Sequence, residues 1–346
     1  MENYTNAPPS TSSVMSSNRT GPLDSLDTGL LVLNMFKCVG LGILILGNWC
    51  ANTMCVIVLR RLRELNPVTK ILMFSMTAAD MATGFMGVFV LGAVIMDDWP
   101  FGEVLCRITG ILNSTLIAAA MFSLLTINAE RYIAVTRPFH YQSIVTIERA
   151  YGILILLWST ALTSGILNHL LPWRRTVYHP ILHSCVADPM DPNQSDLIGT
   201  AWNGIFFLLP ILITMTMFLR IYRVAKHHAN RIAAQTENAP VPVGGREKLN
   251  LKGSATFFLM AVAILSLSTP TLLGYLYENM TRRQLPVVYS YICTLFVFSY
   301  SIVNVGIYYA RNTAFRRTAK TIFRNLFYGE DSSSSSSAAV VSAAWT

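Results

Sequence analysis

The stretch that decides the fold is VLCRITGILNSTLIAAAMFSLLTINAERYIAV, residues 104–135. Cys106 stands near its start, and the triplet Glu130-Arg131-Tyr132 stands near its end. Cys106 and Arg131 are 25 residues apart, about 37 Å of α-helix at 1.5 Å per residue. The hydrocarbon core of a bilayer is about 30 Å thick. The stretch therefore predicts one membrane-spanning helix with a cysteine at one face and a charged triplet at the other.

Six further runs of the chain have the same character, so seven spans are expected. Each run holds about 20 mostly apolar residues, the length that a transmembrane helix needs. The expected spans are Leu30–Leu59, Val68–Met96, Val104–Val135, Ala150–Pro172, Ile198–Ile221, Gly253–Tyr277 and Pro286–Ala310.

The composition excludes a water-soluble protein. Of 346 residues, 53% are hydrophobic and 13% are charged, whereas soluble domains carry about 25% charged residues. A soluble helical protein with seven such runs would have nothing left to cover them. The expected fold class is an all-α membrane protein, a seven-transmembrane helix bundle plus a short amphipathic eighth helix.

The basic residues indicate how the chain is oriented. If the N-terminus is outside, the inner segments hold 19 of the 26 Lys and Arg residues, which the positive-inside rule favours. The net charge of +8 then belongs to the cytoplasmic face, and no nucleic-acid partner is needed to explain it. Four glycosylation sequons fall on the outer side of this topology. They begin at Asn3, Asn18, Asn193 and Asn279.

The chain divides into four parts. Residues 1–29 are expected to form an extracellular glycosylated tail, and residues 30–310 the seven-span bundle. Residues 311–327 combine Phe and Ile with Arg and Lys, which is typical of an amphipathic helix on a membrane surface. Residues 328–346 contain the serine run Ser332–Ser337 and are expected to be a disordered cytoplasmic tail.

Two of the six cysteines are expected to lie outside the membrane on the same side. Cys106 is at the outer start of the third span, and Cys185 is in the outer loop between the fourth and fifth spans. A disulfide between them is chemically reasonable in an extracellular loop; two unrelated thiols are the alternative. No cysteine, histidine or acidic spacing marks a certain metal site.

Short motifs recur in a fixed order along the spans. They are Asn48, Ala78-Ala79-Asp80, Trp99-Pro100-Phe101-Gly102 with Cys106, Glu130-Arg131-Tyr132, Arg137-Pro138, Trp158, Pro210, Pro270, Asn304 and Tyr308. In this order and on these faces they resemble the rhodopsin-like (class A) family of G protein-coupled receptors, over residues 30–326. Helices six and seven are atypical, since Ser268 replaces an aromatic residue before Pro270 and no proline follows Asn304.

The resemblance implies two clusters that change on activation. Glu130, Arg131, Tyr132, Asn304 and Tyr308 would form the switch that couples to a G protein. Asn48, Asp80 and Asn304 would form a polar core, which in the family holds a sodium ion and water. Ala120 stands where the family often has a hydroxyl group, which counts against sodium. The alternative is a purely structural hydrogen-bond network with no cofactor.

The resemblance also places a ligand pocket in the outer half of the bundle. Its expected residues are Asn113, Ile117, Trp202, Phe206, Thr271, Tyr275, Tyr291 and Phe298. Aminergic receptors have an aspartate at the position of Asn113, so a biogenic amine is disfavoured here. The seventh span has no lysine, so retinal is disfavoured too.

The function implied is a plasma-membrane receptor, not an enzyme, that binds an extracellular ligand, most simply a small molecule, and activates heterotrimeric G proteins. A receptor kinase and arrestin are expected to act on Ser332–Ser337, and membrane lipid surrounds the bundle. A seven-span channel or transporter is the alternative. It predicts polar residues along the spans or internal repeats, neither of which the sequence shows.

Overall fold

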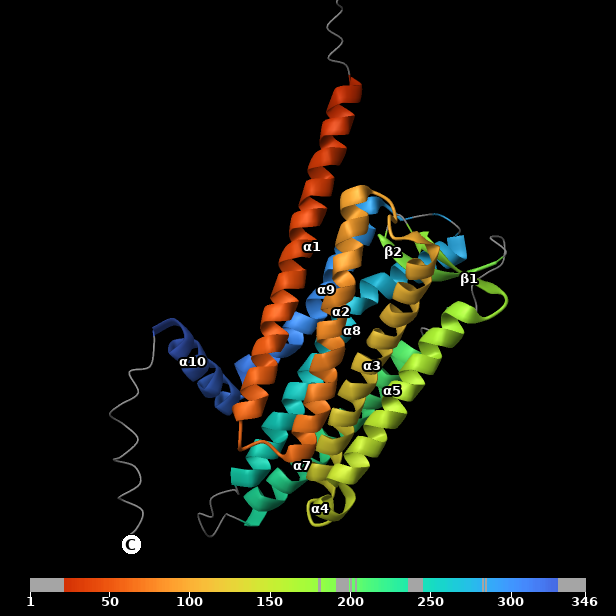
Figure 1. The fold of residues 1–346 in the computed structure, drawn as a ribbon. Coiled ribbons are helices and arrows are strands. Elements are labelled where there is room, and N and C mark those ends of the chain that lie inside the picture. The colour runs from red at the N-terminus through yellow and green to blue at the C-terminus, as the bar shows by residue number, and fades with distance from the viewer. Residues whose placement is uncertain are drawn as a thin grey trace, which may run out of the picture.

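A computed structural model describes residues 22–179, 182–190, 199, 201–202, 204–235, 245–281, 283 and 285–328. The helices run side by side as a bundle, with a small β-hairpin at one end and helix α10 at the other (Figure 1). Among the described residues, seven helices are long and apolar enough to cross a membrane. The expected seven-helix bundle is therefore confirmed.

The spans begin and end close to where the sequence predicts them. The helices are α1 (Pro22–Arg61), α2 (Pro67–Met96), α3 (Gly102–Thr136), α5 (Ile147–Leu170), α7 (Leu209–Gln235), α8 (Gly245–Thr281), α9 (Val287–Arg311) and α10 (Thr313–Tyr328). A π-helical turn, η1 (Gly204–Leu208), leads into α7.

Three helices extend well past the expected boundaries. Helix α7 begins only at Leu209 and runs to Gln235, beyond the expected end of the fifth span at Ile221. Helix α1 begins at Pro22, inside the segment expected to be a tail, and proline suits the first turn of a helix. Helix α8 runs to Thr281, so Asn279 stands in its last turn and not in a loop. The sequons at Asn3, Asn18 and Asn193 and the serine run Ser332–Ser337 lie outside the described residues.

Among the described residues, the loop between α5 and α7 contains a β-hairpin that an all-α prediction misses. Strands β1 (Arg174–His179) and β2 (Ser184–Pro189) pair antiparallel, with Arg174 opposite Pro189 and His179 opposite Ser184. A short hairpin alone is only marginally stable in water. This hairpin has further support from the bundle, because Cys185 of β2 is bonded to α3 and the hairpin packs on α3 and α5.

The main apolar core lies in the half of the bundle opposite the hairpin. It joins Leu72 and Met73 of α2, Ile127 of α3, Met260 of α8 and Phe315 of α10, all at most 2% exposed. Many other large apolar side chains point outward along α1 and α5. Outward apolar faces on long helices are what a lipid environment requires.

Candidate functional site

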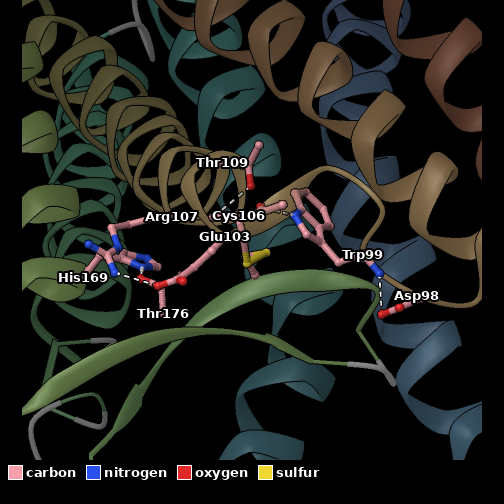
Figure 2. Close-up of a disulfide and its surroundings, with 10 residues drawn as sticks. Asp98, Trp99, Glu103, Cys106, Arg107, Thr109, His169 and Thr176 are labelled. Carbon is pink, nitrogen blue, oxygen red and sulfur yellow. Dashed lines mark hydrogen bonds and ion pairs between the residues drawn. A yellow bond between two sulfur atoms is a disulfide. The ribbon is translucent and has the colours of Figure 1, made fainter.

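A disulfide closes the hairpin end of the bundle. Cys106 in the first turns of α3 and Cys185 on β2 are bonded, with their Cα atoms 5.4 Å apart (Figure 2). Both residues are buried. The expected disulfide is confirmed, and the alternative of two unrelated thiols is excluded. Because the bond joins a loop strand to a membrane-spanning helix, it holds the hairpin across the top of the bundle.

His169, at the end of α5, ties the hairpin to two helices. Its Nδ1 shares a hydrogen bond of 3.0 Å with the Thr176 hydroxyl on β1, drawn in Figure 2. Its Nε2 shares one of 3.1 Å with the Ser114 hydroxyl on α3. The ring lies so close to Gly110 that a Cβ there would stand 2.6 Å from it. Glycine at 110 is therefore required by this close approach.

Beneath the hairpin lies a cavity of about 320 Å³. Its walls come from α2, α3, α5, α8, α9 and β2, and they are mostly apolar with a few hydrogen-bonding groups, as is usual for small-molecule sites. Five of the eight expected pocket residues line it. They are Asn113, Ile117, Thr271, Tyr275 and Phe298.

Trp202, Phe206 and Tyr291 do not line this cavity, which corrects the expectation. The rings of Trp202 and Phe206 lie 4.5 Å apart, and Phe206 also contacts Phe122 of α3 at 6.0 Å, so these side chains pack the α3–η1 contact. The Tyr291 hydroxyl donates to the backbone oxygen of Phe36 on α1 at 2.9 Å. Phe206 therefore packs on α3 and Tyr291 on α1, whereas Trp202 packs on Phe206.

The hairpin supplies cavity residues that sequence reasoning missed. Leu182, Ser184, Val186 and Ala187 line the cavity from above, and Arg174 is buried beside them. Its guanidinium donates to the backbone oxygen of Ala187 at 2.9 Å. None of the described lining residues is acidic. Cys185 was the only sequence signal that placed this loop near the bundle axis.

Asp80 occupies the polar core below the cavity. It is fully buried, and one carboxylate oxygen accepts from the Ser301 hydroxyl on α9 at 2.9 Å. Asn48 of α1 donates to the backbone oxygen of Asp80 at 3.0 Å, and Asn52 donates to the side chain of Asn48 at 2.6 Å. Sequence reasoning named Asn48 and Asp80 but missed Ser301 and Asn52.

Three groups in this core have unused hydrogen-bonding capacity. Within the described part of the chain, the second oxygen of Asp80, the side-chain oxygen of Asn52 and both amide atoms of Asn304 have no hydrogen-bond partner. Buried polar groups without a partner are rare in native proteins, and a bound water or ion usually explains them. The unpaired atoms of the Asp80 core are therefore free to contact a water molecule or an ion.

The Glu130–Arg131 pair lies at the opposite end of α3 from the disulfide. Arg131 donates to Glu130 through Nε at 2.5 Å and through its terminal nitrogen at 2.8 Å. That terminal nitrogen also donates to the Thr69 hydroxyl on α2. Glu130 is 4% exposed and the Arg131 side chain 13%. Tyr132 beside them is half-buried.

Tyr141, on the short helix α4 (Tyr141–Ile144), also contacts the Glu130–Arg131 pair. Its hydroxyl donates to the Glu130 carboxylate, and burial together with the Glu130 charge raises the pKa of that hydroxyl. Sequence reasoning missed Tyr141 and Thr69 because neither is adjacent to the triplet. The two further residues that contact the Glu130–Arg131 pair therefore come from α2 and from the loop after α3.

Tyr308 links α9 to α10. The side chain is buried, its hydroxyl accepts from the Asn312 amide at 2.9 Å, and its ring meets that of Phe315 edge-on at 4.9 Å. Asn304 lies one turn away on the same helix, in the Asp80 core. The two expected switch residues of α9 therefore belong to different clusters in this state.

The sequence matches the profile described as 7 transmembrane receptor (rhodopsin family) over residues 51–308. It is 28% identical to the dog histamine H2 receptor, covering 63% of this chain and 60% of that protein. It is 24% identical to octopamine receptor beta-1R of Drosophila melanogaster, covering 89% and 66%. The guinea-pig alpha-1A adrenergic receptor is 28% identical, covering 56% and 40%. The chain thus spans less than two thirds of each relative.

Proposed function

Because the chain belongs to the rhodopsin family of seven-transmembrane receptors, we propose that it binds an extracellular ligand in the cavity beneath the hairpin and activates a heterotrimeric G protein. One observation carries this proposal. Helix α3 runs unbroken from Cys106, through Asn113 and Ile117 in the cavity wall, to the Glu130–Arg131 pair. A ligand that shifts α3 would therefore act on both ends at once.

The cavity favours a ligand other than a biogenic amine. The similar proteins are receptors for histamine, octopamine and adrenergic ligands by name. An ammonium group buried in a cavity needs an opposite charge, because an unpaired buried charge is costly. The described lining residues offer Asn113, Thr271 and Tyr275 but no carboxylate. The ligand is then a mostly apolar small molecule that forms hydrogen bonds.

The contacts around Glu130 would restrain Arg131 in the resting state. Glu130 holds Arg131 through two hydrogen bonds, and Tyr141 and Thr69 hold the pair. Arg131 is then unavailable to a partner until the pair opens. The comparisons give no support to a channel or transporter.

The decisive measurement is ligand-free G-protein activation in cells, normalised to receptor at the surface. Glu130→Gln should raise basal signalling, because it removes the charge that holds Arg131. Arg131→Ala should abolish signalling without preventing surface delivery. Arg107→Ala is a matched control, since Arg107 is an exposed arginine at the other end of α3. Normal signalling by Arg131→Ala at the surface would refute the coupling role.

The Asp80 core fits a sodium ion. Carboxylate and amide oxygens suit hard cations, and Asp80, Ser301 and Asn304 supply oxygens at one place, although Ala120 adds none. When bound, the ion would supply a positive charge that balances Asp80. Comparing the melting temperature of the purified protein in sodium chloride and choline chloride separates this from a water-filled core.

The proposal extends to both sides of the membrane. The N-terminus is outside, with glycans on Asn3, Asn18, Asn193 or Asn279, and a receptor kinase phosphorylates Ser332–Ser337 to recruit arrestin. Each phosphate adds about −1.5 to −2 charge at neutral pH. Deletion after Asp331 should prolong signalling, whereas unchanged desensitisation would assign no role to the serine run.

A further inference from the structure

A second hollow lies outside the bundle, on the side away from the ligand cavity. It is a groove of about 820 Å³ between α1, α9 and α10. Figure 1 shows α10 projecting from the bundle beside the lower end of α1. Met54 of α1, Ile302 and Gly306 of α9, and Ala319 and Phe323 of α10 form much of its wall. Nothing in the proposed receptor activity uses this groove.

Gly306 gives the groove its depth. A Cβ built at Gly306 meets no atom within 4 Å, so the missing side chain leaves open space and not a close contact. Gly306 lines the groove directly. A glycine in a helix interior costs stability of about 0.5–1 kcal/mol relative to alanine, so its presence calls for a reason. Room for a bound molecule in the groove would explain why glycine is present at this position.

The floor of the groove is fixed by contacts within the protein. The Phe315 ring is 1% exposed and packs on Tyr308. The Asn312 side chain accepts from the backbone N–H of Phe315 at 3.0 Å and so caps α10. Arg316 donates to the backbone oxygen of Ala310 at 3.0 Å. Helix α10 is therefore held against α9, and the groove does not depend on its occupant for its shape.

The rim of the groove is cationic. Lys320 and Arg324, four residues apart on α10, both line it and are exposed. Helix α10 contains four basic residues and no acidic one, and no described lining residue of the groove is acidic. An apolar trough with two cations at its edge matches one molecule with an apolar chain and an anionic head.

We propose that this groove binds one anionic phospholipid. Its acyl chain lies along Ile302 and Gly306, and its charged headgroup contacts Lys320 and Arg324. Basic residues next to a membrane attract anionic lipids, and burial of the chain adds a favourable hydrophobic contribution. A symmetric dimer through the same groove is disfavoured, because a two-fold interface would face this basic patch with its own copy.

The test uses the full-length protein in detergent and native mass spectrometry, with phosphatidylserine and phosphatidylcholine of identical chains as probes. Wild type should bind phosphatidylserine more tightly. Lys320→Gln with Arg324→Gln should weaken phosphatidylserine binding by about 30-fold, the factor expected for two near-surface cations, and leave phosphatidylcholine unchanged. The control is Arg311→Gln with Arg317→Gln, two exposed arginines of this region that do not line the groove.

A second variant tests the chain site separately. Gly306→Leu should fill the groove and remove both lipids while Lys320 and Arg324 remain, and Gly306→Ala should have a smaller effect. If Gly306→Leu fails to fold, the charge variants still decide. Equal losses in the Lys320/Arg324 and Arg311/Arg317 pairs would show diffuse attraction and overturn the proposal. So would equal binding of the two lipids, or a dimer mass that Gly306→Leu abolishes.

Discussion

At the scale of single residues, Glu130 owes its position to more than its neighbour in sequence. Its carboxylate accepts from Arg131 and from Tyr141, and Arg131 in turn donates to Thr69. Hydrogen bonds to charged groups contribute about 1.5–3 kcal/mol each. The restraint on Arg131 is thus shared between α2, α3 and the loop that follows.

Tyr141→Phe should raise ligand-free signalling. The change removes a donor to Glu130 and keeps the ring, so the pair is held less firmly. A coupling of about 1–3 kcal/mol corresponds to about 5–150-fold, and because one of several contacts is lost we expect a rise near the lower end. The measurement is basal G-protein activation per surface receptor. Tyr151→Phe, at an exposed tyrosine of α5, should have no effect.

His183 makes stability depend on pH. Its Nε2 lies 3.4 Å from the Lys37 ammonium group, and its Nδ1 lies 3.1 Å from the Tyr178 hydroxyl. Burial lowers the pKa of His183, Lys37 and His179 lower it further, and Asp97 opposes them. Burial and the nearby Asp97 and Asp98 raise the pKa of Tyr178 to about 12, so Tyr178 stays neutral.

Lowering the pH should therefore reduce the stability of the folded protein, because His183 resists protonation there. The unfolded chain takes up a proton near pH 6.5, whereas folded His183 resists it. The stabilisation is complete above that pH and is lost as the pH falls below it. The melting temperature of the wild type should fall between pH 7.5 and pH 5, and by less in His183→Asn. Asparagine tolerates the positive φ of 47° at this position. Exposed His140→Asn should behave as wild type.

At the scale of elements, the β-hairpin and α3 act as one unit. The disulfide, the His169 hydrogen bonds and the close approach at Gly110 all fix the hairpin over the cavity. Six residues of the hairpin and its turn line the cavity, so losing the hairpin would remove one of its walls. Removing a native disulfide typically costs about 2–5 kcal/mol in small secreted domains.

Cys106→Ala and Cys185→Ala should each lower surface delivery and melting temperature, and the double variant should be no worse than either one. Residues that act through one bond have non-additive effects. Thermal unfolding of the purified proteins and surface labelling in cells measure this. Cys50→Ala is the control, because Cys50 is a free, exposed cysteine of α1. Additive losses would mean that the disulfide does not hold the hairpin.

At the scale of the whole molecule, charge and hydropathy specify which end faces which solvent. The hairpin end carries the disulfide, and the α4–α10 end carries the basic residues of α10. Disulfides persist in oxidising compartments, and Lys and Arg accumulate on the cytoplasmic side. Both features favour an extracellular hairpin.

An N-terminal tag should be labelled on intact cells, and a C-terminal tag only after permeabilisation. This follows from the seven spans, which place the two ends on opposite sides. Flow cytometry of the two tagged forms gives the answer. A tag at the N-terminus seen only in permeabilised cells would reverse the orientation and refute the extracellular ligand site.

The sequence by itself determined the number of spans, their approximate limits and the family, and it predicted the disulfide without excluding two unrelated thiols. The spans and the family motifs depend on local properties. A long apolar run is recognised without its packing partners, and Ala78-Ala79-Asp80 and Glu130-Arg131-Tyr132 are each continuous in the chain. The position of a residue along its helix also predicted where some side chains lie. This holds for five pocket residues, Asn48 and Tyr308.

Only the tertiary structure decided what surrounds these residues. The hairpin over the cavity, the contacts of Tyr141 and Thr69 with the Glu130–Arg131 pair, and the groove at Gly306 each join residues that are not adjacent in the chain. Phe206 and Tyr291 pack on neighbouring helices instead of lining the cavity, and Trp202 packs on Phe206. The physical reason is that periodicity fixes a side chain's direction on its own helix, whereas its contacts depend on how the helices pack.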